Sequence, residues 1–457
     1  MNIVLISTYE LGRQPFGLAS PAAWLREQGA RVTCLDLSRE ALREAAVRGA
    51  DLIAFYVPMH TATRLAVALL PVVGGLNSRA HLCFYGLYAP VNEEYLRRLG
   101  VKTILGGEFE EGLASLAARL SANGGVGAQT EPVVSLARQK FRVPDRRDFV
   151  PLEKYAHLVM PGGEARTVGY TEASRGCKHL CRHCPIVPVY QGTFRIVDRE
   201  IVLADIRQQA AAGAQHISFG DPDFFSGIGH AIPLVEALHR EFPRLTYDVT
   251  IKVEHLLKHQ DCLEKLRETG CLFVTSAVES VDGEVLEKLD KHHTSADFLR
   301  VVELFRDAGL VLQPTFVPFM PWTTLESYSE LLDVIRANCL IENVAPIQLA
   351  IRLLIPAGSR LLELEDIREI VGPFDEAALV YPWKNVDARV DRLCAELQQI
   401  VHAGEKTNQP RARIFERIEA AAFAAAGAKH DKRAKEARLP ILAARAAIPY
   451  LNEPWYC

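Results

Sequence analysis

Three cysteines lie close together in the middle of the chain. Cys177, Cys181 and Cys184 follow the spacing C-x3-C-x2-C, directly after a predicted strand and the turn formed by Arg175 and Gly176. Three thiolates on one loop can bind three irons of a cubane [4Fe–4S] cluster and leave the fourth iron open to another ligand. The spacing therefore predicts an iron–sulfur cluster with one accessible iron.

Zinc is the alternative occupant of this loop. A structural zinc site takes four ligands, which most often come as two separated pairs. One group of three cysteines is present here, and His179 or His183 in the same loop could supply a fourth ligand. Three thiolates on one short loop fit an iron–sulfur cluster better, and zinc remains the alternative.

The composition is that of a globular protein with several domains. The chain has 457 residues, of which 49% are hydrophobic and 24% are charged, and its net charge is -4. We expect no nucleic-acid partner, because there is no basic excess. No apolar run reaches the about 18 residues of a membrane span, and the N-terminus lacks the pattern of a signal peptide. We therefore expect no membrane association and a cytoplasmic, reducing compartment.

Strands and helices alternate along most of the sequence. Predicted strands of the first block are 2–7, 31–36, 51–57, 81–85 and 102–105. Those of the second block are 169–174, 216–220, 247–251, 272–278, 311–317 and 347–353. This alternation favours an α/β fold in which a Rossmann-like parallel sheet is followed by an open six-unit βα barrel, since six units are too few for a closed eight-unit barrel.

The chain is expected to divide into four parts. These are a Rossmann-like domain at 1–125, a linker at 126–165, the barrel at 166–360, and a helical C-terminal region with a tail at 361–457. Within the last part we predict a solvated helix at 416–435, because this segment is rich in alanine and charge. The six cysteines outside the loop and the C-terminus are expected to be small buried hydrophobic residues.

The cysteine loop after the first strand of a six-unit barrel resembles that of the radical SAM superfamily. The resemblance covers about 167–358. It implies that S-adenosylmethionine (SAM) chelates the open iron, and that one electron from the cluster breaks a C–S bond of its sulfonium. It also implies a reducing partner such as flavodoxin or ferredoxin and a small-molecule substrate. The task of the protein is then to orient one C–S bond and exclude water.

The resemblance also assigns cofactor contacts. At 219–223, Gly220, Asp221 and Asp223 stand where the family has a Gly-Gly-Glu-like turn that holds the methionine amino group. This is a departure from the family pattern, and an Asp-Pro turn or a helix cap is the alternative for each aspartate. The segment 276–280 resembles the Gly-x-Glu-Ser pattern, so Ser276 and Glu279 are expected to contact SAM and Glu279 to serve catalysis.

Five further residues are predicted at the edge of the barrel. Lys252 and Glu254 follow the third strand and are expected to face the ribose or the substrate. Gln348 and Arg352 share one strand face, where Arg352 could bind a carboxylate or form a structural ion pair. Ile355 begins a Pro-Gly turn that resembles the end of the sixth unit, where it is expected to contact the adenine.

The first block resembles the cobalamin-binding domain of many superfamily members. The motif Asp-x-His-x-x-Gly, which supplies an axial histidine to cobalamin, is absent after the first strand. Some relatives bind cobalamin without that ligand, so cobalamin remains a candidate cofactor. The alternative is a domain that only packs on the barrel and shapes its mouth.

The end of the sequence resembles a radical SAM group with a Cys-Sec-Ala-Glu-Pro or Cys-Cys-Ala-Glu-Pro tail. This chain stops at Cys457, and one hypothesis is that a selenocysteine codon follows. That group includes an enzyme of arsinothricin biosynthesis, which moves the 3-amino-3-carboxypropyl group of SAM to trivalent arsenic. The resemblance implies Cys457 as a catalytic thiol and arsenite as a candidate substrate, because soft thiolates bind soft metals well. A terminal thiol without function is the alternative.

Three functions remain open. The leading prediction is a radical SAM transferase, with arsenic as a candidate acceptor. A 5′-deoxyadenosyl-radical enzyme or a cobalamin-dependent methyltransferase acting on a small molecule is the second. A non-enzymatic zinc-binding protein is the third.

Overall fold

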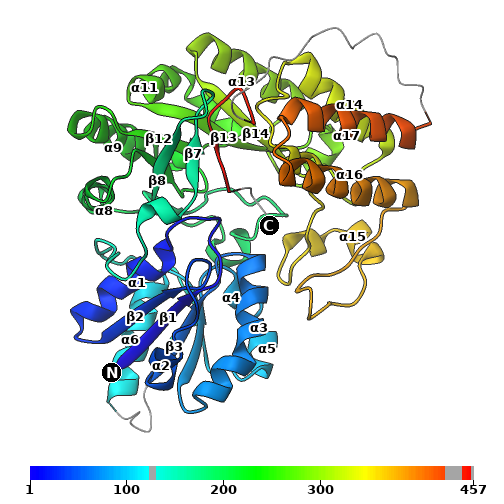
Figure 1. Ribbon diagram of the computed structural model, residues 1–457. Coiled ribbons are helices and arrows are strands. Elements are labelled where there is room, and N and C mark those ends of the chain that lie inside the picture. The colour runs from blue at the N-terminus through cyan, green and yellow to red at the C-terminus, as the bar shows by residue number, and fades with distance from the viewer. Residues whose placement is uncertain (123–129, 428–444, 454–457) are drawn as a thin grey trace.

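The chain folds around two large sheets with separate apolar cores, and a third sheet has only two short strands. The computed structural model describes residues 1–122, 130–427 and 445–453. Figure 1 shows the first sheet in blue at the N-terminal end, the second in green and yellow above it, and the orange helices beside the second sheet. Among the described residues, no helix is both long and apolar enough to cross a bilayer.

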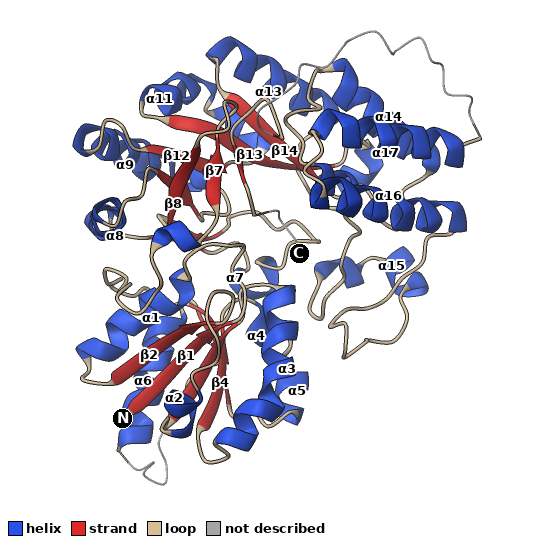
Figure 2. Ribbon diagram, viewed as in Figure 1, coloured by secondary structure: helices blue, strands red, loops and turns tan. Residues whose placement is uncertain are grey.

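The first sheet is parallel and has the strand order β2-β1-β3-β4-β5-β6. Its strands are β1 (Asn2–Ser7), β2 (Arg31–Asp36), β3 (Leu52–Tyr56), β4 (His81–Tyr85), β5 (Thr103–Gly107) and β6 (Val134–Ser135). Its helices are α1 (Phe16–Glu27), α2 (Glu44–Arg48), α3 (His60–Leu76), α4 (Tyr88–Val91), α5 (Glu93–Arg98) and α6 (Phe109–Ser121). Apolar side chains of α1 and α6 cover one face, and those of α2 to α5 cover the other (Figure 2). This is the Rossmann-like arrangement that the alternating sequence predicts.

Helix α1 begins at Phe16, five residues before Pro21, so Pro21 lies inside the helix and not at its start. A proline inside a helix lacks the N–H that would bond to the carbonyl four residues before it. That carbonyl belongs to Gly17, and the Tyr85 hydroxyl donates a hydrogen bond to it over 2.9 Å. The tyrosine thus replaces the bond that Pro21 removes, and the helix continues through the proline.

The second sheet is curled and has the order β14-β13-β12-β11-β8-β7-β15. Its strands are β7 (His157–Val159), β8 (Ala165–Thr171), β11 (His216–Phe219), β12 (Thr246–Thr250), β13 (Cys271–Glu279), β14 (Val311–Phe316) and β15 (Tyr450–Leu451). Neighbours among β8 and β11 to β14 pair in parallel, as in a βα barrel. The sixth strand, predicted at 347–353, is reduced to a 3-10 turn at Pro346–Leu349 and a parallel bridge between Phe319 and Arg352.

Helices cover the outside of the curled sheet. They are α8 (Arg199–Ala211), α9 (Ile228–Glu241), α10 (Val253–Lys258), α11 (Leu263–Glu268), α12 (Gly283–Lys288), α13 (Ser295–Ala308) and α14 (Leu325–Ala337). Three more helices follow along the chain: α15 (Glu365–Ile370), α16 (Ala388–Lys406) and α17 (Arg411–Ala425). The large apolar core lies between the sheet, these outer helices and α16 and α17.

The segment 126–165, predicted as a linker, contributes one strand to each sheet. Its β6 extends the first sheet in parallel beside β5, and its β7 pairs antiparallel with β8. The C-terminal strand β15 then adds to β7, and the Gln313 side-chain amide of β14 donates a 2.7 Å hydrogen bond to the carbonyl of Pro449. The C-terminal segment therefore links the two edges of the curled sheet, where Figure 1 shows it in red between β7 and β14.

Two expectations for the outer parts of the chain are wrong. Helix α17 is not a solvated helix, because it buries Ile418, Ala421 and Ala422 on α14 and α16. The rest of the predicted helix, 428–435, lies outside the described residues. Cys339 is exposed rather than buried, because it follows the end of α14 in a left-handed conformation with φ 53°.

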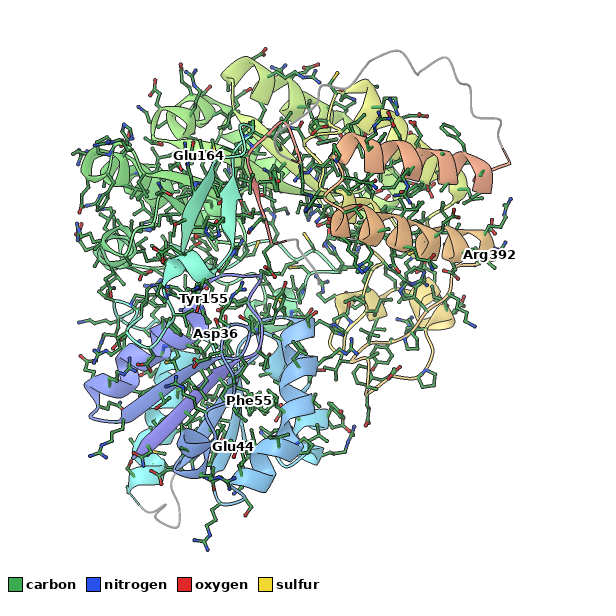
Figure 3. The ribbon with its side chains drawn as sticks, in the orientation of Figure 1. Asp36, Glu44, Phe55, Tyr155, Glu164 and Arg392 are labelled. Carbon is green, nitrogen blue, oxygen red and sulfur yellow. The ribbon has the colours of Figure 1, made fainter. Side chains whose placement is uncertain are left out.

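Buried charges join the two sheets. The Arg175 guanidinium donates hydrogen bonds of 2.8 and 2.6 Å to the carboxylate of Glu110 on α6, and both side chains are buried. Arg146 similarly binds Asp205 of α8 over 2.7 and 2.8 Å. Figure 3 shows Tyr155 next to Asp36 at the same junction, where burial and the Asp36 carboxylate raise the pKa of the tyrosine hydroxyl. These contacts hold the carboxyl edge of the first sheet against the cysteine loop.

Candidate active site

The cysteine loop lies between two short strands that pair with each other. Strand β9 (Ser174–Gly176) precedes it, the short helix α7 (Val187–Tyr190) ends it, and β10 (Phe194–Ile196) then pairs antiparallel with β9. Gly176 has φ +70°, and a Cβ at this position would lie 2.2 Å from the Thr193 carbonyl oxygen. The glycine is therefore required where the chain turns into the loop.

The three cysteines are largely shielded from solvent. Cys177 and Cys181 are buried and Cys184 is partly buried, and no disulfide joins them. Burial raises the pKa of the Cys177 thiol, and it raises that of Cys184 to about 12. The Lys252 ammonium lies 3.6 Å from the Cys181 sulfur, where it can stabilise a thiolate. The donor set fits an iron–sulfur cluster, whose binding would release the thiol protons.

The two histidines of the loop face carboxylates. His183 Nε2 lies 3.1 Å from Glu279 Oε1, and His179 Nε2 lies 3.6 Å from Asp223 Oδ2. Both imidazoles thus face carboxylates and not the thiols. This arrangement weakens the zinc alternative, which needs one of them as a fourth ligand beside the cysteines.

Glu279 lies at an irregular point at the carboxyl end of β13. The strand register shifts between Ala277 and Glu279, and Glu279 has φ +68°, which is rare for a residue other than glycine. Its carboxylate accepts a 3.3 Å hydrogen bond from the Lys291 ammonium, beside the contact with His183. Burial alone would raise the pKa of Glu279, but Lys291 and His183 outweigh it and hold the pKa at about 2. The strained backbone aims a permanently charged carboxylate at the cysteine loop.

Two buried side chains near Glu279 have polar atoms without hydrogen-bond partners among the described residues. These atoms are the Ser276 hydroxyl and both ring nitrogens of His293. Burial, with help from Lys291 and Lys252, lowers the pKa of His293 to about 4, so its imidazole is neutral. Buried polar groups without partners are uncommon and mark places where a ligand can bind. These atoms offer unused hydrogen-bond capacity near Glu279, as a polar cofactor requires.

Sequence reasoning found Ser276 but missed Lys291 and His293. Both follow α12 in the run Lys291-His292-His293, which matches no motif. The signal that could have found them is the concentration of titratable groups in this run, which sits between two helices.

The turn after β11 serves two purposes. Gly220 is required by packing, since a Cβ there would lie 1.8 Å from the Tyr170 hydroxyl. The Asp221 carboxylate accepts hydrogen bonds from the Ala173 N–H, over 2.9 Å, and from the Ser174 hydroxyl. Asp221 therefore supports the segment that leads into the cysteine loop, and burial raises its pKa to about 7.

Asp223 is also buried and binds more partners. Its carboxylate accepts hydrogen bonds from the Ser226 hydroxyl over 2.9 Å and from the Lys252 N–H over 3.3 Å. His255 Nδ1 lies 2.6 Å from the same carboxylate. Despite burial, the contacts with His179 and His255 hold the pKa of Asp223 well below its usual range.

The predicted residues of the sixth unit make structural contacts. The Gln348 side-chain oxygen accepts a 3.2 Å hydrogen bond from the Phe316 N–H, and the Ile355 carbonyl accepts a 2.8 Å bond from Tyr381. Arg352 binds Asp391 of α16 over 2.7 Å, and its guanidinium lies 3.5 Å from the centroid of the Trp383 ring. The structural ion pair, which was the alternative for Arg352, is thus present. Cys457 lies outside the described residues.

The first domain presents its carboxyl edge to this site. The Tyr190 hydroxyl at the end of the cysteine loop donates a 3.3 Å hydrogen bond to the Gly107 carbonyl at the end of β5. At the end of β1, the Ser7 hydroxyl and Glu10 Oε2 are buried without hydrogen-bond partners among the described residues. Ligands of doubly wound α/β domains bind at this edge. The residues present are compatible with a second cofactor between the domains.

Comparison with known proteins identifies the domain that carries the cysteine loop. Residues 171–335 match the radical SAM superfamily model. Hopanoid C-3 methylase of Methylococcus capsulatus is 24% identical over 343 residues, which cover 72% of this chain and 64% of the methylase. The chain therefore spans less than two thirds of the length of that relative.

Two solved structures resemble the fold of this chain. The cobalamin-dependent SAM radical enzyme OxsB, with aqua-cobalamin and SAM bound, gives a TM-score of 0.73 at 15% identity over 93% of this chain and 71% of OxsB. The radical SAM methyltransferase TsrM from Kitasatospora setae gives 0.59 at 19% identity over 74% of this chain and 71% of TsrM. Residues 171–335 thus form a radical SAM domain, which implies a [4Fe–4S] cluster and SAM, and the chain shares the fold of cobalamin-dependent radical SAM enzymes.

Proposed function

We propose that the chain is a radical SAM transferase in which Cys177, Cys181 and Cys184 hold the [4Fe–4S] cluster. The observation that carries this proposal is the buried three-cysteine loop, which lies beside the charged Glu279 and Lys252 at the carboxyl ends of β13 and β12. The cluster, when bound, supplies the electron that cleaves the sulfonium of SAM. Residues of the barrel hold SAM and exclude water around it.

Each residue has a proposed role in this reaction. Glu279 and the Ser276 hydroxyl bind polar groups of SAM, since the former is charged and the latter has no hydrogen-bond partner within the described part of the chain. Lys252 stabilises the negative charge of the cluster thiolates. Neutral His293 offers one donor and one acceptor to SAM or the substrate. An electron donor such as flavodoxin or ferredoxin reduces the cluster.

Methyl transfer with cobalamin is the proposal that the overall fold favours. The first domain presents the Ser7 hydroxyl and Glu10 Oε2 at its carboxyl edge, and both atoms are buried without a hydrogen-bond partner in the ranges that the structure describes. OxsB and TsrM share this two-domain arrangement, and both have been solved with cobalamin bound. In this proposal the first domain binds cobalamin without an axial histidine from the Asp-x-His-x-x-Gly motif.

Transfer of the 3-amino-3-carboxypropyl group to trivalent arsenic is the second candidate. It is supported by the path of the C-terminal segment, which lies parallel to β8 and brings Glu453 to within 3.7 Å of Arg39 in the first domain. The described end of the C-terminal segment, at Glu453, therefore lies next to the first domain.

Anaerobic reconstitution followed by product analysis tests these proposals. The wild-type protein is expected to be brown, to bind about four irons per chain, and to cleave SAM in the presence of dithionite. Cys181→Ala is expected to lose the colour and the cleavage, whereas Cys339→Ala, which changes an exposed cysteine, keeps both. A colourless protein that binds zinc stably in air would contradict the radical SAM assignment.

The products distinguish the transferred groups. 5′-Methylthioadenosine together with an arsenic–carbon product from arsenite would establish aminocarboxypropyl transfer. A corrinoid retained through purification, together with a methylated product, would establish the cobalamin route. 5′-Deoxyadenosine as the sole nucleoside, without a corrinoid, would contradict both routes.

A further inference from the structure

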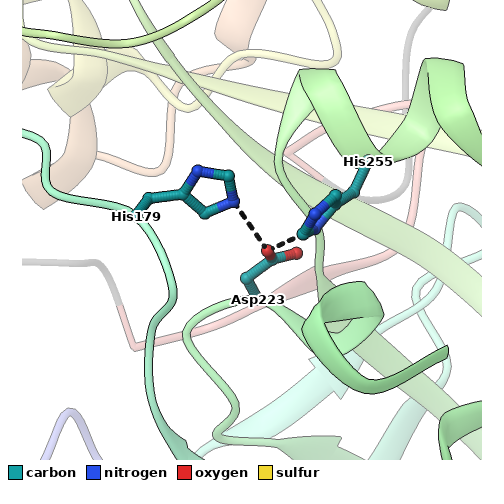
Figure 4. A group of neighbouring side chains, drawn as sticks. All are labelled: His179, Asp223 and His255. Carbon is teal, nitrogen blue, oxygen red and sulfur yellow. Dashed lines mark hydrogen bonds and ion pairs between the residues drawn. The ribbon is translucent and has the colours of Figure 1, made fainter. Parts of the chain in front are cut away.

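Three side chains from three separate elements meet beside the cysteine loop. His179 comes from the loop itself, Asp223 from the turn after β11, and His255 from α10. One potential ligand atom of each lies within 4.8 Å of the other two. Figure 4 shows both imidazoles directed at the Asp223 carboxylate, and the closest nitrogens, His255 Nδ1 and His179 Nε2, lie 2.6 and 3.6 Å from the same oxygen, Oδ2.

The groups behind these side chains resemble the surroundings of bound metals. A histidine that binds a metal usually donates its other ring N–H to a carboxylate, and a ligating carboxylate is usually hydrogen-bonded in turn. Glu254 Oε2 lies 3.5 Å from His179 Nδ1 and is buried without a hydrogen-bond partner of its own among the described residues. The Ser226 hydroxyl donates a 2.9 Å hydrogen bond to Asp223 Oδ2. The hydrogen bond to the Asp223 carboxylate is therefore present, and Glu254 lies where a metal-bound His179 could donate to it.

Hydrogen bonding alone leaves part of this cluster unexplained. His255 can donate to Asp223, but His179 Nε2 has no hydrogen-bond partner among the described residues although it faces a fully buried carboxylate. We propose that His179, Asp223 and His255 bind one divalent first-row transition-metal ion, separate from the iron–sulfur cluster. Two histidines and one carboxylate form the ligand set found for Fe²⁺ and Zn²⁺ in sites that keep open positions.

The ion would connect parts of the site that are far apart in the sequence. It would join the cysteine loop, through His179, to the turn after β11 and to the helix that begins after Lys252. The role proposed for it is to fix the loop that carries the cluster ligands. The proposal does not depend on which group the enzyme transfers.

Metal binding to the full-length protein tests the proposal. Replacing Cys177, Cys181 and Cys184 by alanine together removes the thiol ligands, and Zn²⁺ binding is then measured by equilibrium dialysis against a competing chelator. One zinc per chain is expected. His255→Gln in this background is expected to weaken binding at least ten-fold, and so is His179→Gln. His259→Gln is the matched control, because His259 lies on the next turn with its ring centroid 6.1 Å from that of His255.

The wild-type protein provides a second measurement that does not need the cysteine variant to fold. After anaerobic loading with iron and sulfide and then with Zn²⁺, metal analysis is expected to find one zinc beyond the cluster iron, and His255→Gln is expected to lose the zinc while keeping the iron. Absence of stoichiometric zinc, Fe²⁺ or Mn²⁺ from both proteins would overturn the proposal. Zinc binding that is equal in His255→Gln and His259→Gln would also overturn it. If the radical SAM assignment is wrong, metal analysis of the loaded wild-type protein would instead find no cluster iron.

Discussion

Individual residues at this site carry charges that their neighbours determine. Asp221 and Asp223 are two positions apart and both are buried, yet burial raises the pKa of one, while two histidines lower the pKa of the other. The difference follows from their partners, since Asp221 binds neutral donors and Asp223 faces imidazoles. Sequence alone predicts carboxylates here but not which of them stays protonated.

Asp221 makes the stability of the protein depend on pH near neutrality. Its pKa is about 7 in the folded protein and has its ordinary value of about 3.9 in the unfolded chain. The folded state therefore binds the extra proton between these values, and stability falls as pH rises from about 4 to about 7. Denaturant unfolding of the cluster-free protein should show a loss of roughly 2–4 kcal/mol from Asp221 across this range.

Asp221→Asn is the matched variant, because asparagine keeps the shape and can still accept the hydrogen bond from Ala173. Its free energy of unfolding should fall less than that of the wild type between pH 5 and pH 7.5. Parallel curves for the two proteins would show that Asp221 does not hold this proton.

Lys252 should set the reduction potential of the cluster. Its ammonium lies 3.6 Å from the Cys181 sulfur, and a positive charge favours the reduced cluster, which is more negative. Lys252→Met is expected to make the potential more negative by on the order of tens of millivolts. A redox titration followed by electron paramagnetic resonance measures this. Lys258→Met, at the exposed end of α10, should leave the potential unchanged. Equal potentials in all three proteins would refute the role of Lys252.

At the scale of elements, sequence patterns predict the long parallel strands well and the short added strands not at all. Strands β1, β2 and β4 match their predicted bounds, because each is an apolar run between turn residues. Strands β7 and β15 contain only three and two residues, and they pair across almost 300 positions of the chain. Strands this short contain too few residues to show a recognisable sequence pattern. Their pairing is explained only by the closure of the curled sheet.

The contacts of β15 should contribute measurably to stability. The Tyr450 side chain is buried, and the Arg411 guanidinium lies 5.2 Å from the centroid of its ring. Tyr450→Ala is expected to lower the free energy of unfolding by roughly 2–4 kcal/mol, as for other buried aromatic residues. Val386→Ala, at a side chain that is 93% exposed, should leave it unchanged. If the two variants are equally stable, the strand is not held in solution as described.

At the scale of the whole molecule, the site depends on contacts that no local pattern indicates. Cys177 to Cys184 are recognisable from their spacing, but the groups around them come from Lys252 just before α10, from the segment after α12 and from the first domain. Arg175 lies next to the motif and reads as an ordinary turn residue. Its function becomes visible only when α6 of the first domain brings Glu110 against it.

The Arg175–Glu110 pair should be essential for joining the two domains. Removing one partner of a buried ion pair leaves the other charge without compensation and costs about 3–5 kcal/mol. Arg175→Met is expected to show this loss, measured by thermal or denaturant unfolding. Arg48→Met, which breaks the exposed pair with Glu44, should have no measurable effect. A similar small effect for both variants would mean that solvent reaches Glu110.

The link that β15 makes between the two edges of the second sheet affects the order in which the protein can fold. Domains fold as they leave the ribosome, beginning with the N-terminal one. Strand β7 emerges early, but its partner β15 is synthesised after every helix of the barrel. During synthesis the edge of β7 therefore stays unpaired and the curled sheet stays unlinked. The pairing of the curled sheet can therefore be completed only after the helices α16 and α17 have been synthesised.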